Sequence, residues 1–291
     1  MRSVQFLVFF SIVILIYGLV NFYIYRHGMM ALPQGMTFRR WYPWIFLFLS
    51  ASYIIGRVLE RVWISPVSTF FTFVGSFWLA LMVYFLMAVL VIDLVRLILF
   101  ILPGKPHFAA ANYTEIKKYL FFGITALVSL VVLAGHINAI TPRVTRLDLK
   151  IAKKAGSMKT LHIAAASDIH MGTLVGPRRT AQLVRMLNER KADIILLAGD
   201  IVDEDLAPVI RYDLGRSLLK LKAPLGVYAI TGNHEYIGGA EAAVKYLGEH
   251  GVKMLRDTAV LVNESFYLAG RNDRDSRRFS AKDRKDLKTI L

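Results

Sequence analysis

The chain has 291 residues and a formal net charge of +15, and 55% of its residues are hydrophobic. It contains no cysteine, which excludes disulfide bonds, thiolate metal sites and a cysteine nucleophile. The apolar residues are concentrated before about residue 140, and the remainder has the composition of an ordinary globular protein. We therefore expect a membrane-embedded half followed by a water-soluble half.

Four long apolar runs fill the first half, at residues 4–25, 44–64, 68–102 and 120–140. Each reaches the ~20 residues that a transmembrane helix needs. The first run lacks a small-residue cleavage pattern, so we interpret it as a retained span and not as a signal peptide. Pro43 precedes the second run, where the start of a helix tolerates proline. Residues 1–140 are thus predicted to form a polytopic α-helical membrane region.

Basic residues gather beside these runs and in a linker at residues 141–158. Anionic lipid headgroups explain this placement, so the lipid bilayer is the expected partner and no nucleic acid is expected. Four spans place both termini on one side of the membrane. The distribution of Lys and Arg favours the cytoplasmic side of the cell (inner) membrane for the second half. Asp93 and Arg96, three residues apart in the third run, are expected to form a structural pair and not a proton relay.

Strands and helices are predicted to alternate in the second half. Short apolar runs predict strands at residues 161–166, 194–198, 227–230, 259–262 and 266–269. Apolar periodicity predicts helices at residues 177–190, 208–221, 240–250 and 282–291. This alternation is typical of an α/β layered domain, which we place at residues 159–291.

Three motifs follow the first three of these strands: Asp168-Ile169-His170, Gly199-Asp200-Ile201-Val202-Asp203 and Gly232-Asn233-His234-Glu235. Ligands of open α/β sheets bind at the carboxyl ends of the strands. The intervals of 32 and 33 residues between the motifs are each about one βαβ crossover, so the motifs can end on neighbouring strands. Singly, the aspartates could be helix N-caps and the asparagine a turn residue.

The chemistry of the three motifs points to a metal-assisted phosphoesterase. Hydrolysis of a phosphoester needs charge neutralised on the non-bridging oxygens and a hydroxide generated near neutral pH, and two metal ions provide both. Asp, His and Asn together suit Mn²⁺, Fe or Zn²⁺ better than a soft-metal site. Glycines at 199 and 232 permit close backbone approach just before the expected ligands.

In this order and at these intervals the motifs resemble the calcineurin-like metallophosphoesterase family, and the surrounding phrases resemble its membrane-anchored bacterial branch. The resemblance implies an αββα-sandwich-like domain that binds two divalent metal ions (Mn, Fe or Zn). It implies Asp168 and His170 on one metal, Asp200 bridging both, and Asn233 on the second. His234 would contact the phosphate and protonate the leaving group, so that His234 and Asp200 are the implied catalytic residues. Asp203 and Glu235 match supporting positions of the motifs.

The family's pattern continues with a lone histidine and then a Gly-His-x-His motif, whereas no histidine follows His250 here. We therefore expect the phosphoesterase domain to be incomplete: a fragment first, with a split or degenerate protein as alternatives. The expected function is hydrolysis of a phosphomonoester, phosphodiester or pyrophosphate. The resemblance suggests a lipid-linked substrate such as UDP-2,3-diacylglucosamine. The alternative is a catalytically incomplete membrane protein that binds or senses a partner.

Overall fold

The protein, seen as a computed structural model, is described over residues 2–101, 112–153, 158–280 and 283–291. It separates into two compact units, Met1–Val144 and Thr145–Leu291. The expected end of the third span at Leu102 and the expected start of the last helix at Lys282 lie outside the described residues.

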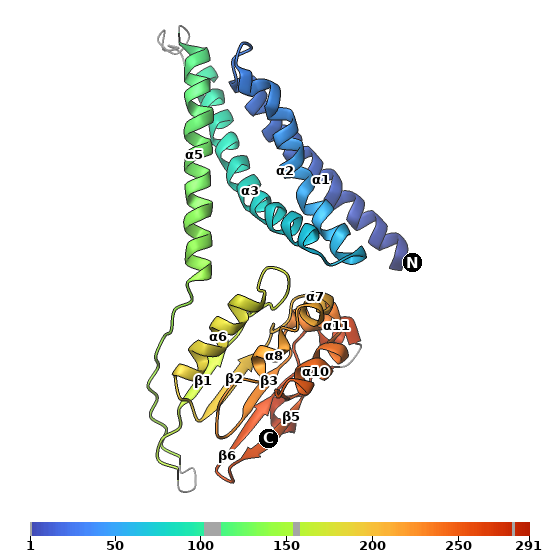
Figure 1. The fold of residues 1–291 in the computed structure, drawn as a ribbon, viewed down its shortest axis with the longest axis vertical. Helices are drawn as coiled ribbons and strands as arrows, with labels where there is room; N and C mark the ends of the chain where they lie inside the picture. Colours follow the sequence, from blue (N-terminus) through green and yellow to red (C-terminus); the bar gives the residue numbers. More distant parts are fainter. Residues whose placement is uncertain (1, 102–111, 154–157, 281–282) are drawn as a thin grey trace. The chain divides into compact units, whose positions relative to one another are not determined.

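The first unit is helical (Figure 1), with α1 Arg2–Ala31, α2 Thr37–Val62, α3 Pro66–Ile101 and α5 Tyr113–Ile140. All four helices are long and apolar enough to cross a membrane, which confirms the predicted polytopic region. Pro43 was expected to precede the second helix, but it lies inside α2, which begins at Thr37. Proline lacks only its own backbone N–H, and the first two turns of a helix can accommodate that loss more easily than its middle can.

Small residues bring α2 and α3 close together. A Cβ atom added to Gly56 would lie 2.5 Å from the backbone nitrogen of Thr72. Such close backbone approach is typical of membrane helices, which associate by packing and not by exclusion of water. The expected pair of Asp93 and Arg96 forms, with 3.3 Å between a carboxylate oxygen and a guanidinium nitrogen. The other Asp93 oxygen accepts a hydrogen bond of 2.6 Å from Tyr23, so the pair also joins α3 to α1.

The second unit contains a parallel sheet in the order β1-β2-β3-β4 and a separate antiparallel hairpin, β5–β6. The strands are β1 Ile163–Ala166, β2 Ile194–Ala198, β3 Val227–Ile230, β4 Lys253–Met254, β5 Thr258–Val262 and β6 Phe266–Gly270. The helices are α6 Pro177–Glu189, α7 Leu206–Arg211, α8 Gly215–Leu218, α9 Asn233–Gly238, α10 Ala240–Glu249, α11 Ser276–Ser280 and α12 Leu287–Ile290. Strands in the order of the chain, each followed by helix, give the predicted α/β class.

Alternation along β2 explains the layers of this unit (Figure 1). Ile195 and Leu197 point to one face and pack in the core beneath helices α6 and α10. Ile194 and Leu196 point to the opposite face and pack against the hairpin, whose Val262 is buried there. A strand covered on both faces reads as a continuous apolar run, which is why residues 194–198 were predicted without an alternating pattern.

Two helix predictions were wrong in extent. The helix expected over residues 208–221 is broken into α7 and α8, because Asp213 between them has a positive φ of 49° that an α-helix cannot contain. The helix expected over residues 282–291 is reduced, among the described residues, to Leu287–Ile290. Helix α9 was not predicted, because its residues carry a motif and no apolar periodicity.

Tyr246 joins the two short helices to α10. Its buried hydroxyl accepts a 2.9 Å hydrogen bond from the backbone N–H of Gly215 and donates one of 3.3 Å to the carbonyl of Val209. Burial raises the pKa of the Tyr246 phenol above its ordinary value. The neutral phenol therefore stabilises the fold below pH ~10, and this contribution is lost as the pH rises through the raised pKa of the folded state.

We expect Tyr246→Phe to lower the free energy of unfolding by about 1–2 kcal/mol at neutral pH, because the Gly215 N–H loses its acceptor. The difference between the two proteins should shrink above pH ~10, where the wild-type phenol begins to ionise at a cost. Thermal unfolding of the purified full chain between pH 8 and 11 (a range set by the ordinary tyrosine pKa) measures both effects. A difference that stayed constant with pH would contradict the role of burial.

Candidate metal centre

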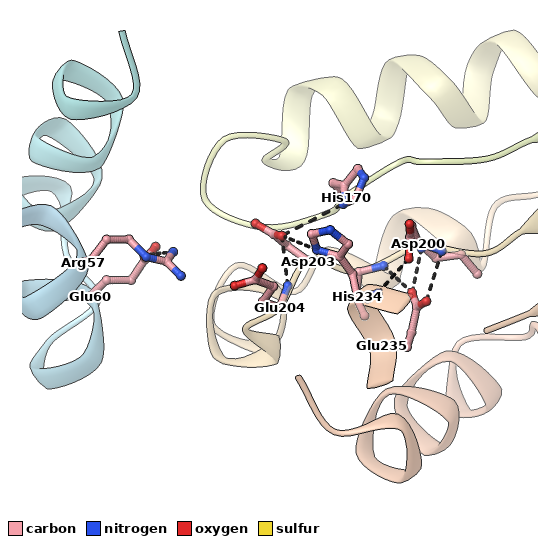
Figure 2. Close-up of polar contacts among 10 residues, drawn as sticks. Arg57, Glu60, His170, Asp200, Asp203, Glu204, His234 and Glu235 are labelled. Atoms are coloured by element: carbon pink, nitrogen blue, oxygen red, sulfur yellow. Dashed lines mark hydrogen bonds and ion pairs between the residues drawn. The ribbon is translucent and has the colours of Figure 1, made fainter. Parts of the chain in front are cut away.

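The three motifs lie together at the carboxyl edge of the parallel sheet (Figure 2). Asp168 and His170 follow β1, Asp200 follows β2, and Asn233 and His234 open α9 just after β3. The pairing register places Ala166 opposite Leu197 and Ala198 opposite Ile230, so the three strands end side by side. The expected convergence of the motifs on one edge is what the backbone shows.

The loops after β1 and β2 continue to pair beyond the sheet. The N–H of Asp168 donates to the carbonyl of Gly199 (3.2 Å), and the N–H of His170 donates to that of Asp200 (2.9 Å). Met171 then donates to Ile201 at 2.8 Å. This ladder holds the first and second motifs in register, so their side chains are placed by main-chain hydrogen bonds.

Three of the predicted site residues have left-handed backbones. The φ angles are 53° at Asp168, 51° at His170 and 49° at Asp200. Residues other than glycine adopt this region rarely, and the conformation costs of order 1 kcal/mol at each. Strain of this kind persists only where the surroundings hold it, and it gathers at functional sites. It turns the side chains out of the alternation that a continuing strand would impose.

Glycine lets the second and third loops touch. A Cβ atom on Gly199, whose φ is +87°, would lie 3.0 Å from the Cα atom of Gly232. A Cβ atom on Gly232 would lie 2.5 Å from the backbone nitrogen of Asp200. Both positions therefore exclude any larger residue unless the loops move apart. This confirms the close backbone approach expected at the two glycines.

Glu235 closes the two loops with a carboxylate that is fully buried. One oxygen accepts hydrogen bonds from the N–H groups of Ile201 (2.7 Å) and Val202 (2.9 Å). The other accepts from Asp200 (3.0 Å) and Gly232 (2.7 Å), as Figure 2 shows. Successive backbone N–H groups around a left-handed residue form a concavity that suits an anion, and here the anion belongs to the protein.

Asp200 returns the connection. One of its carboxylate oxygens accepts a 2.9 Å hydrogen bond from the backbone N–H of His234. Loop two thus binds the backbone of loop three through Asp200, and loop three binds the backbone of loop two through Glu235. The conformation of Asp200 is therefore determined on its main chain and on its side chain.

Three side chains form a group that fits a metal ion. Donor atoms of His170, Asp200 and His234 all lie within 4.8 Å of one another. Two imidazoles and a carboxylate are a donor set that suits Zn²⁺, Fe or Mn²⁺. Asp168 is exposed just beyond β1, and Asn233 is half-buried at the start of α9, and neither belongs to this group of three. His234, expected beside the phosphate, lies with its ring centroid 4.4 Å from that of His170.

Asp203 accompanies both histidines. One of its carboxylate oxygens lies 3.2 Å from Nδ1 of His234 and 4.0 Å from Nδ1 of His170. The sequence placed Asp203 and Glu235 only in supporting positions of their motifs. Which atoms they would contact could not be predicted, because neither contact follows from spacing within a motif.

Comparison with known proteins agrees with this geometry. The family described as calcineurin-like phosphoesterase matches residues 161–287. The chain is 32% identical over 144 residues to an uncharacterized metallophosphoesterase of Aquifex aeolicus, which covers 50% of this chain and 54% of the relative. It is 37% identical over 114 residues to a transmembrane protein with metallophosphoesterase domain of Bos taurus, covering 39% of this chain and 24% of the relative.

A third relative has a named activity. The chain is 25% identical over 158 residues to UDP-2,3-diacylglucosamine pyrophosphatase LpxG of Chlamydia muridarum, covering 52% of this chain and 48% of the relative. In each of these three alignments the chain spans less than two thirds of the relative. No solved structure matches the chain. The second unit of this membrane protein is therefore a calcineurin-like metallophosphoesterase domain.

Proposed function

We propose that the protein is a membrane-anchored, metal-dependent phosphoesterase that acts on an amphiphilic phosphate or pyrophosphate ester. The observation that carries the proposal is the group of His170, Asp200 and His234, whose donor atoms lie within 4.8 Å at the carboxyl edge of the sheet. Asp168 and Asn233 flank this group and complete the proposed ligands of two divalent metal ions. When bound, such ions would neutralise charge on the phosphate and lower the pKa of water.

The protein's own residues would orient the reaction. Asp200, held by Glu235 on its backbone, offers a free carboxylate oxygen between the loops while its other oxygen binds the His234 N–H. With Nδ1 of His234 donating to Asp203, its Nε2 is left to face the substrate. The Asp203 carboxylate would stabilise the protonated imidazole, which can then give its proton to the leaving oxygen.

An amphiphilic substrate is supported by two observations. Four helices long and apolar enough to cross a membrane precede the domain in the same chain. One relative is named for hydrolysis of UDP-2,3-diacylglucosamine, a nucleotide-linked lipid. We propose this compound as the first substrate to test. The proposed location is the cell (inner) membrane with the domain on the cytoplasmic side, supported by the distribution of Lys and Arg.

The proposal is tested by removing and restoring metal. The full chain in detergent is treated with a chelator and then given Mn²⁺, Fe²⁺ or Zn²⁺, with a phosphomonoester, a phosphodiester and UDP-2,3-diacylglucosamine as substrates. We expect hydrolysis to be lost with the chelator and restored by at least one metal. Neither bound metal nor hydrolysis in any combination would sink the proposal and favour a protein that only binds or senses a partner.

Asp203→Asn is expected to lower kcat by about 100-fold for a substrate with an alkoxide leaving group, because His234 loses the charge that stabilises its protonated form. The same variant should lose much less with a p-nitrophenyl ester, whose leaving group needs no proton. Steady-state kinetics with this pair of substrates measures the contrast. Equal losses with both substrates would contradict the role of His234 as a proton donor.

A further inference from the structure

Residues 146–151, which we call the amphipathic segment, read Arg-Leu-Asp-Leu-Lys-Ile. Apolar and charged side chains alternate strictly, so an extended backbone places Leu147, Leu149 and Ile151 on one face. The other face carries the three charged side chains. The segment begins six residues after Ile140, the last residue of the membrane helix α5.

The structure has this segment extended and without a protein partner on its apolar face. Residues 146–151 belong to no helix or strand, and every residue from 141 to 153 is exposed. The exposed fractions are 76% for Leu147, 72% for Leu149 and 75% for Ile151. Arg146 and Asp148 form an ion pair of 3.1 Å, which shows that alternate side chains share a face.

A row of three exposed aliphatic side chains calls for a partner. Single exposed leucines are ordinary on protein surfaces, but a contiguous apolar row marks an interaction surface. The flanking charges select the partner. Arg143, Arg146, Lys150 and Lys153 are opposed only by Asp148 between residues 143 and 153, so the segment is basic as well as amphipathic. Basic residues next to a membrane span are attracted to anionic lipid headgroups.

We propose that the amphipathic segment lies in the headgroup layer of an anionic bilayer, with Leu147, Leu149 and Ile151 directed toward the acyl chains. Its charged face, with Arg146 and Lys150, contacts lipid phosphates and water. The segment lies at the level of the headgroups and no deeper, because its backbone N–H groups make no hydrogen bond within the described chain and need water there. The partner is a lipid surface, to which α5 already brings the segment.

This placement changes the tether of the phosphoesterase domain. Between Ile140 and β1, which begins at Ile163, the chain has 22 residues. With the amphipathic segment held at the bilayer, only residues 152–162 remain as a free tether. The domain would be kept within reach of the membrane surface, which suits an amphiphilic substrate. The inference itself concerns lipid contact and does not depend on catalysis.

The absence of natural cysteine allows a direct test. Single cysteines are introduced at each position from 146 to 151 in the full chain, spin-labelled, and reconstituted in phosphatidylcholine vesicles with and without phosphatidylglycerol. Accessibility to lipid-soluble oxygen and to a water-soluble nickel chelate is measured at each position. Leu261→Cys, at a half-exposed leucine of β5, serves as the matched control within the domain.

We expect a period of two. The ratio of oxygen to nickel accessibility should be several-fold higher at positions 147, 149 and 151 than at 146, 148 and 150, and phosphatidylglycerol should increase the contrast. The label at position 261 should show neither effect. High nickel accessibility at all six positions would place the segment in water and overturn the proposal. Low accessibility to both reagents at the apolar positions would also overturn it, because it would show contact with protein and not with lipid.

Discussion

Asp200→Asn is expected to lower kcat/KM by about 10²–10³-fold and to reduce the metal content of the purified protein. Asp200 lies between His170 and His234, with donor atoms within 4.8 Å of both, and it supplies the negative charge in this group of three. Asparagine keeps an oxygen that can accept the His234 N–H, so the loops should stay together. The loss would then report the charge of the ligand and not collapse of the site.

Metal content by elemental analysis and hydrolysis of a phosphodiester measure the two effects in the same samples. Asp283→Ala is the matched control, because the Asp283 carboxylate is 80% exposed and pairs only with the exposed Arg277 at the surface. Asp200→Ala removes the acceptor as well, and it should also lower the thermal stability. A variant with Asn at 200 that kept both its metal and its activity would show that Asp200 is not a ligand.

Glu235→Gln is expected to weaken metal binding by about 10–100-fold, although Glu235 is not a proposed ligand. Each oxygen of the buried carboxylate accepts two backbone N–H groups. Glutamine has one oxygen, and its NH₂ group would face two donors. The left-handed backbone of Asp200 would lose an acceptor that holds it. We also expect a loss of about 3 kcal/mol in the free energy of unfolding, because buried donors are left without partners.

Titration of the apoprotein with Mn²⁺ and chemical unfolding measure the two effects separately. Glu249→Gln removes the same charge from a side chain that is 58% exposed at the end of α10, and it should change neither quantity. If Glu235→Gln lowered the stability but bound Mn²⁺ as tightly as the wild type, Glu235 would belong to the fold alone and not to the metal centre.

The sequence predicted the elements that hold the site, because these depend on local pattern. Buried strands such as residues 194–198 and 227–230 are short continuous apolar runs, and both were predicted with their observed bounds. The four membrane helices follow from length and apolarity alone. The spacing of the motifs by one crossover each was enough to expect them at one edge of a parallel sheet, and the pairing of β1, β2 and β3 shows it.

The conformations inside the site could not be predicted, because contacts distant in sequence impose them. The positive φ angles at Asp168, His170 and Asp200 depend on hydrogen bonds between loops that are more than 30 residues apart. The same holds for Asp213, which breaks a helix whose composition would allow it to continue. Glu235 illustrates the limit best: glutamate is usually exposed, and only the fold reveals four donors gathered around it.

The contact between Gly199 and Gly232 sets the width of the centre by main-chain atoms touching main-chain atoms. No side chain acts as a spacer between these loops, so repacking of the core beneath the sheet can alter stability without altering the distance between the ligands that the loops carry. A methyl group at either glycine would act as a wedge driven between the two loops. The least tolerant positions of this site are thus the two that have no side chain at all.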